Sequence, residues 1–277
     1  MNLEKGSEKF HFPFLFSGLI FLISGYNILY ISHIVLNTTC CNINALFIRG
    51  GHLMSDKIMN HVKNHIKDPG SAITHFIAML MAIFAAVPLI IKAAHEPEKI
   101  YVISITVYAL SLILLYAAST TYHTFDKSPK INTILKKFDH MMISVLIAGS
   151  YTPICLLVLP HKIGVILLSI VWGIAIIGIL LKAFWVYCPK WVSSVLYIGM
   201  GWTCVLAFTQ ILNSMSPVAF GWLLAGGLIY TIGGVIYALK LPIFNNRHKN
   251  FGSHEIFHLF VMGGSACHFI VMYVFVL

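Results

Sequence analysis

The chain is short of charged residues, and acidic residues are especially scarce. Only 10% of its 277 residues are Asp, Glu, Lys or Arg, and the Asp and Glu residues together number nine. Soluble domains carry about 25% charged residues, so this chain has too few to cover a surface that faces water. The composition therefore excludes a soluble enzyme, a disordered chain and a nucleic-acid-binding protein. The net charge of +9 is instead typical of basic loops in a membrane protein.

The chain also lacks a cysteine pattern that would indicate a disulfide framework or a zinc ribbon. Its six cysteines include no CxxC pair, and several fall inside apolar runs. Small apolar packing residues are the simplest interpretation of these cysteines. We therefore predict no disulfide bond.

What the chain has in abundance is apolar sequence, since 58% of its residues are hydrophobic. The apolar runs are about twenty residues long, the length of a membrane-spanning helix, and they do not alternate as the strands of a membrane barrel do. The sequence therefore predicts an all-α polytopic protein of the cell membrane, surrounded by membrane lipids. Seven runs are expected to span: 71–94, 101–123, 138–159, 162–183, 191–212, 218–239 and 254–277.

Two segments precede this seven-helix domain of residues 71–277. Residues 54–70 carry apolar residues on one helical face and lysines elsewhere, which predicts a short amphipathic helix on a membrane surface. Residues 1–53 contain one further apolar stretch, 12–36. Because Arg49, Gly50 and Gly51 can be encoded by purine-rich codons that resemble a bacterial ribosome-binding site, we expect translation to start at Met54.

The basic residues of the loops predict the orientation of the seven helices. Counted from Arg49 onwards, thirteen Lys and Arg lie on one side of the bundle and three on the other. The basic side is the cytoplasmic one, so the core would start inside and its C-terminus would lie outside. This is the reverse of a G-protein-coupled receptor.

Successive spans cross the membrane in opposite directions, and this alternation (the helix parity) brings several ionisable residues to one level of the membrane. Helix 2 runs inward, and helices 1, 3 and 7 run outward, so their polar ends meet on the cytoplasmic side. Ionisable residues in spanning helices are costly and usually functional. The residues concerned are His75, His123, Asp139, His254 and His258, with His140 beside Asp139 and His268 deeper in helix 7.

This collection suits a metal ion. His254 and His258 lie four residues apart on one face of a helix, and His123 would complete a three-histidine set with a fourth position open for water. Asp139 could orient a ligand or hold that water, and Ser119 lies one turn before His123 on the same face. The alternatives are that each histidine is an interfacial residue and that Asp139 is a carboxylate favoured by a helix N-terminus.

Five short motifs resemble the hemolysin III family, the bacterial branch of the progestin and adipoQ receptor superfamily. They are SAITH (71–75), STTYH (119–123), FDH (138–140), AGSYTP (148–153) and GSHEIFH (252–258). The resemblance covers about residues 55–277. It implies that His123, His254 and His258 bind zinc, that Asp139 holds a water at the metal, and that Ser119 belongs to a hydrolytic site.

Three functions remain open at this stage. The first is a zinc-dependent hydrolase that acts on a membrane lipid, with an amide as one candidate linkage. The second is a pore-forming cytolysin in which zinc is structural, since the family is named for haemolysis. The third is a signalling receptor, which is ranked last because no large loop or tail offers a docking platform. The sequence leaves the oligomeric state and the roles of His75, His140 and His268 undetermined.

Overall fold

A computed structural model of the chain describes residues 66–239 and 252–277, so the predictions about residues 1–53 and the surface helix of 54–70 lie largely outside it. The described residues are almost entirely helical and form no strand. Within these described residues, seven helical segments are long and apolar enough to cross a membrane, which agrees with the seven spans predicted for residues 71–277 and makes the chain a multi-pass integral membrane protein. Their bounds are α5 Pro69–Ala94, α6 Lys99–Thr124, α7 Pro129–Pro153, α8 His161–Phe184, α9 Lys190–Gly201 with α10 Phe208–Ser214, α11 Pro217–Leu239 and α13 Ser253–Ile270.

When the π-helices that follow α7 and α13 are included, the spans begin and end within three residues of the predicted positions, except at the start of the third span. That helix was expected at residue 138, but α7 begins at Pro129. Ser128 caps it by accepting a hydrogen bond from the Ile131 amide at 3.4 Å, and proline favours the first helical position. The first turns of α7 are polar, so a search for apolar runs could not find them.

Three spans contain a stretch in which the backbone hydrogen bonding departs from the α-helical pattern. Pro153 ends α7 and leads into a π-helix over Ile154–Val158. Because proline has no amide hydrogen, the regular ladder cannot continue unchanged there. A 3₁₀ turn, Trp202–Ala207, separates α9 from α10, and a π-helix, Val271–Val276, follows α13.

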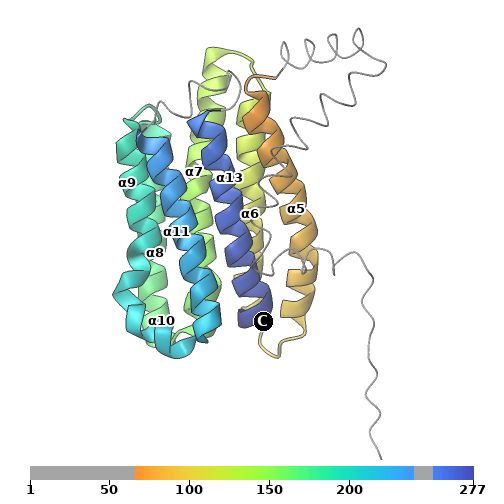
Figure 1. The fold of residues 1–277 in the computed structure, drawn as a ribbon, viewed down its shortest axis with the longest axis vertical. Coiled ribbons are helices and arrows are strands. Elements are labelled where there is room, and N and C mark those ends of the chain that lie inside the picture. Colours follow the sequence, from red (N-terminus) through yellow and green to blue (C-terminus); the bar gives the residue numbers. More distant parts are fainter. Residues whose placement is uncertain (1–65, 240–251) are drawn as a thin grey trace, which may run out of the picture. The chain divides into compact units, whose positions relative to one another are not determined.

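The helices close into a ring in which the last span returns to the first (Figure 1). Successive helices α5, α6, α7 and α8 pack in sequence order, α11 packs on α9, and α13 lies between α11 and α5. The starts of α5, α7 and α13 and the end of α6 therefore lie at the same end of the bundle, drawn uppermost in Figure 1. Large apolar side chains such as Phe84 and Phe184 point outward and are exposed, as a lipid-facing surface requires.

Glycine allows α11 and α13 to approach closely at Gly226 and Gly233. A Cβ atom added at Gly226 would lie 2.4 Å from Cδ2 of His268, and one added at Gly233 would lie 2.6 Å from Cβ of Phe260. Small residues at such positions are typical of helix pairs in membranes. This close packing fixes the position of α13, which carries two histidines of the site described next.

Candidate metal centre

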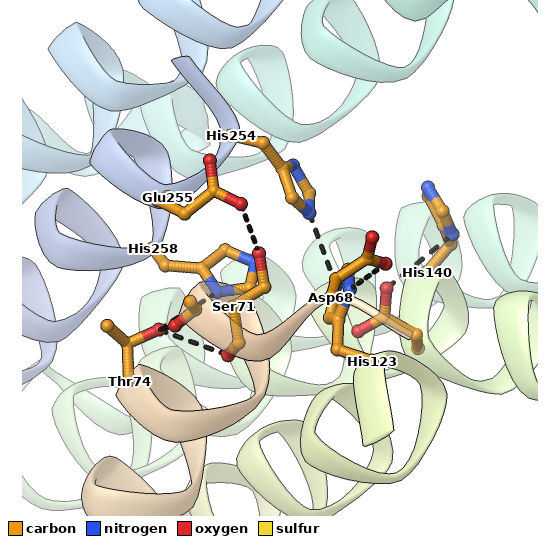
Figure 2. Close-up of polar contacts among 10 residues, drawn as sticks. Asp68, Ser71, Thr74, His123, His140, His254, Glu255 and His258 are labelled. Carbon is orange, nitrogen blue, oxygen red and sulfur yellow. Dashed lines mark hydrogen bonds and ion pairs between the residues drawn. The ribbon is translucent and has the colours of Figure 1, made fainter. Parts of the chain in front are cut away.

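Three histidines from two helices converge at the end of the bundle where α6 ends and α13 begins (Figure 2). His123 lies in the last turn of α6, and His254 and His258 lie in the first two turns of α13. The Nε2 atoms of His123 and His254 are 3.2 Å apart, and one ligand atom from each of the three rings lies within 4.8 Å of the others. His123 and His258 are buried, and His254 is half-buried.

The donor set could hold a metal ion. Zinc binds imidazole nitrogen at about 2.0–2.1 Å in a tetrahedral arrangement, which places two such nitrogens about 3.3 Å apart. The separation of 3.2 Å between the Nε2 atoms of His123 and His254 agrees with that value. Three histidines also leave one of four positions for water or substrate, as in catalytic zinc sites.

The start of α5, together with the Asp68 that precedes it, contacts two of the three histidines. Oδ2 of Asp68 lies 3.0 Å from Nδ1 of His123, and Oγ1 of Thr74 lies 3.4 Å from Nδ1 of His258 (Figure 2). The hydrogen bond with His123 holds the pKa of Asp68 below its usual value, against the opposing effect of partial burial. A carboxylate at Nδ1 directs Nε2 of the same ring towards a metal.

Glu255 joins α13 to α5 and is not a member of the histidine cluster. Its Oε1 atom accepts a hydrogen bond from Oγ of Ser71 at 2.8 Å, and its Oε2 atom accepts one from the Gly252 amide at 2.8 Å. The carboxylate thus caps the N-terminus of α13 and fixes it against the first turn of α5. Helix α5 therefore supports the candidate centre through Asp68, Ser71 and Thr74.

A cavity of about 250 Å³ extends from the cluster into the bundle. Apolar side chains form most of its wall, and the polar residues that line it near the cluster include Ser119 and Asp139. Both are buried, with Ser119 2% and Asp139 8% exposed. The structure thus places Asp139 and Ser119 on the same cavity as His254 and His258, at the end of the bundle that helix parity predicts.

The remaining predicted histidines lie around this cavity and not within the cluster. His75 stacks on His258, with ring centroids 3.6 Å apart. His140 directs Nδ1 to the Lys136 carbonyl at 2.8 Å and lies 3.8 Å from Oδ2 of Asp139. His268 lies further along α13 against the ring of Tyr230. Within residues 66–239 and 252–277, the ring nitrogens of His75 and His268 have no hydrogen-bond partner.

Sequence reasoning missed Asp68 and Thr74 as members of the site. Asp68 stands directly before Pro69, near the end of residues 54–70, which the sequence predicts to form a surface helix. The parity argument that placed His75 at this end of the bundle applies equally to residues seven positions earlier. The sequence could therefore have predicted that Asp68 and Thr74, near the start of the first span, lie at the same end of the bundle as the histidines.

Comparison with known proteins agrees with the motifs. The family model described as "Haemolysin-III related" matches residues 63–269. The chain is 36% identical to Hemolysin-3 of Bacillus cereus over 81% of its length and 98% of the relative's, and 39% identical to a Hemolysin-3 homolog of Bacillus subtilis over 72% and 89%. It is also 24% identical to the adiponectin receptor protein of Drosophila melanogaster over 73% of the chain and 49% of the receptor.

Proposed function

Because the chain belongs to the haemolysin III family, we propose that its histidine cluster binds zinc and hydrolyses an acyl linkage of a membrane lipid. One observation carries this proposal: three imidazole nitrogens within 4.8 Å of one another lie at the end of a buried cavity that Ser119 and Asp139 also line. The candidate metal ligands, a candidate base (Asp139) and a hydroxyl donor (Ser119) therefore lie at the same cavity.

Each residue has a distinct role in this proposal. Bound zinc would polarise the substrate carbonyl and lower the pKa of a water molecule to about 7. Asp139, which is acceptor-only when ionised, holds the attacking water in the cavity and takes up its proton. Ser119 donates a hydrogen bond to the carbonyl oxygen of the substrate. Hydrolysis then transfers the hydroxyl of water to the acyl carbon and a proton to the leaving amine or alcohol.

The shape of the cavity supports a lipid as the substrate. Its wall is mostly apolar and reaches from His254 at one end of the bundle to Phe208 and Phe220 on the other side of the membrane core. An acyl chain fits such a wall because it has no polar group to satisfy. A lipid whose acyl chain lies within the bundle would place its carbonyl group near the polar residues beside the histidine cluster. An amide is the linkage that the family resemblance favours.

The principal alternative is a pore-forming protein in which zinc is structural. Its support is the name of the bacterial relatives, Hemolysin-3. A monomeric pore requires a polar path across the membrane. The cavity wall and the middles of the spans are largely apolar, which disfavours a pore through one copy of the bundle.

The two functions are separated by assaying Asp139→Asn and Asp126→Asn on the same preparations. Asp126 is the control because it lies in an exposed loop and accepts a hydrogen bond from Asn132. We expect purified Asp139→Asn to retain its zinc, measured by elemental analysis, and to hydrolyse extracted membrane lipids about 100-fold more slowly, measured by mass spectrometry. Asp126→Asn should match the unmodified protein in both.

Liposome leakage completes the test. A hydrolase should cause little leakage in either variant, whereas a pore with structural zinc should keep its leakage in Asp139→Asn because the fold survives. Full leakage with no hydrolysis of any lipid would overturn the proposed hydrolase. Loss of zinc from His258→Ala but not from His95→Ala, an exposed histidine at the end of α5, would show that the cluster binds the metal.

A further inference from the structure

A buried lysine lies between α8 and α9, outside the histidine cluster. Lys182, in the last turn of α8, is only 1% exposed. Its Nζ atom donates hydrogen bonds to Sγ of Cys188, at 3.0 Å, and to Oγ of Ser193. Sγ and Oγ are themselves 3.4 Å apart. Three side chains that the proposed hydrolysis does not use thus form a closed cluster.

The charge of Lys182 requires a counter-ion. A buried ammonium group is costly unless an anion and hydrogen bonds compensate for lost water. Among the residues that the structure describes, the ion pairs join Asp68 to His123 and Asp139 to His140, and neither includes Lys182. Of the two groups that accept hydrogen bonds from Nζ, the hydroxyl does not ionise near neutral pH, but the thiol can. The Cys188 thiolate is therefore the natural counter-ion.

The surroundings of the thiol favour this ionised form. Burial acts to raise the pKa of Cys188, but hydrogen bonds from Lys182 and Ser193 and the positive charge of Lys182 outweigh it, so the pKa lies below its usual value. Cys188 also belongs to the short connection between α8 and α9, outside the spans, and its side chain is buried there.

We propose that Cys188 is a site of reversible oxidation by hydroperoxides, with Lys182 holding the reactive thiolate. The thiolate sulfur attacks one peroxide oxygen, the O–O bond breaks, and a new S–O bond forms. Hydrogen peroxide leaves its second oxygen as hydroxide, which takes up a proton and becomes water. Sulfur is oxidised by two electrons to the sulfenic acid, and a thiol reductant reverses the change.

The internal control is Cys204. It is partly exposed, more so than Cys188, and its Sγ contacts the Gly201 carbonyl at 3.7 Å without a lysine. Cys204 lies in the span Lys190–Ser214, so its labelling gives the rate for a thiol inside the membrane that has no lysine partner.

The experiment treats the full chain in lipid nanodiscs with hydrogen peroxide and traps sulfenic acid with dimedone. Peptide mass spectrometry then gives the rate of labelling at each cysteine. We expect Cys188 to label at least about tenfold faster than Cys204, because one pKa unit changes the thiolate fraction about tenfold below the pKa. Equal labelling, or faster labelling of Cys204, would overturn the proposal.

Two variants test the role of the lysine. Lys182→Met keeps the length of the side chain but removes the charge, and it should slow labelling of Cys188 about tenfold. Ser193→Ala keeps the ammonium group and should retain most of the labelling. Unchanged labelling in a folded Lys182→Met protein would contradict the proposal. If that variant does not fold, an absence of Cys188 labelling in the unmodified protein would overturn the proposal by itself.

Discussion

At the scale of single residues, the contact between Asp68 and His123 sets the orientation of one metal ligand. The 3.0 Å separation of Oδ2 and Nδ1 leaves Nε2 of His123 directed at His254. Such outer partners usually contribute about 10–100-fold to metal affinity. We therefore expect Asp68→Ala to weaken zinc binding by about that factor, measured by competition with a chromophoric chelator.

The matched control for this residue is Asp126→Ala, which removes a carboxylate from an exposed loop at the same end of the bundle. It should leave zinc affinity unchanged. Equal affinities for the two variants would mean that Asp68 does not position His123. Asp68→Asn, which keeps an oxygen acceptor of similar size, should lose less affinity than Asp68→Ala.

At the scale of helices, the contact of α11 with α13 holds two of the three histidines in place. A methyl group at Gly233 would lie 2.6 Å from Cβ of Phe260, an atom fixed to the α13 backbone. Gly233→Ala should therefore displace α13 and cost about 1–3 kcal/mol of overpacking, more than the roughly 1 kcal/mol gained from helix propensity. We expect a lower unfolding temperature in detergent and weaker zinc binding.

Gly221 provides the comparison within the same helix. A Cβ atom there would meet no neighbouring atom within 4 Å, so Gly221→Ala should leave both properties unchanged or raise the unfolding temperature slightly. If both glycine variants behaved alike, close packing at Gly233 would not explain the position of α13.

The helices also show what the sequence could and could not predict. Apolar runs predicted the seven spans because the membrane imposes their length. They did not reveal the first turns of α7 from Pro129, which are polar, or the 3₁₀ turn over Trp202–Ala207, where apolar sequence continues through a change of hydrogen bonding.

For the site, helix parity placed His123, His254 and His258 at one end of the bundle. It could not show that Asp68 contacts His123, because that depends on how α5 packs against α6.

At the scale of the whole molecule, the side of the membrane on which the site lies is still a prediction. The structure places the start of α5 and the end of α6 together, and it places the C-terminus at the other end of the bundle (Figure 1). The count of thirteen Lys and Arg against three predicts that the histidine end lies in the cytoplasm. An alkaline phosphatase fused after Leu277 should therefore be active in intact cells, because that enzyme folds only outside the cytoplasm.

A second fusion tests the same orientation from the opposite end of the bundle. The connection between α6 and α7, near Asp126, lies at the histidine end. A fluorescent protein inserted there should fluoresce, whereas alkaline phosphatase at that position should be inactive. The reverse pattern at both positions would put the histidine end of the bundle outside the cell. Lipid would then have to enter from the outer leaflet, and the basic residues around the site would no longer follow the positive-inside rule. Since the two ends are fixed relative to each other by the bundle, a mixed result would contradict the seven-span ring itself.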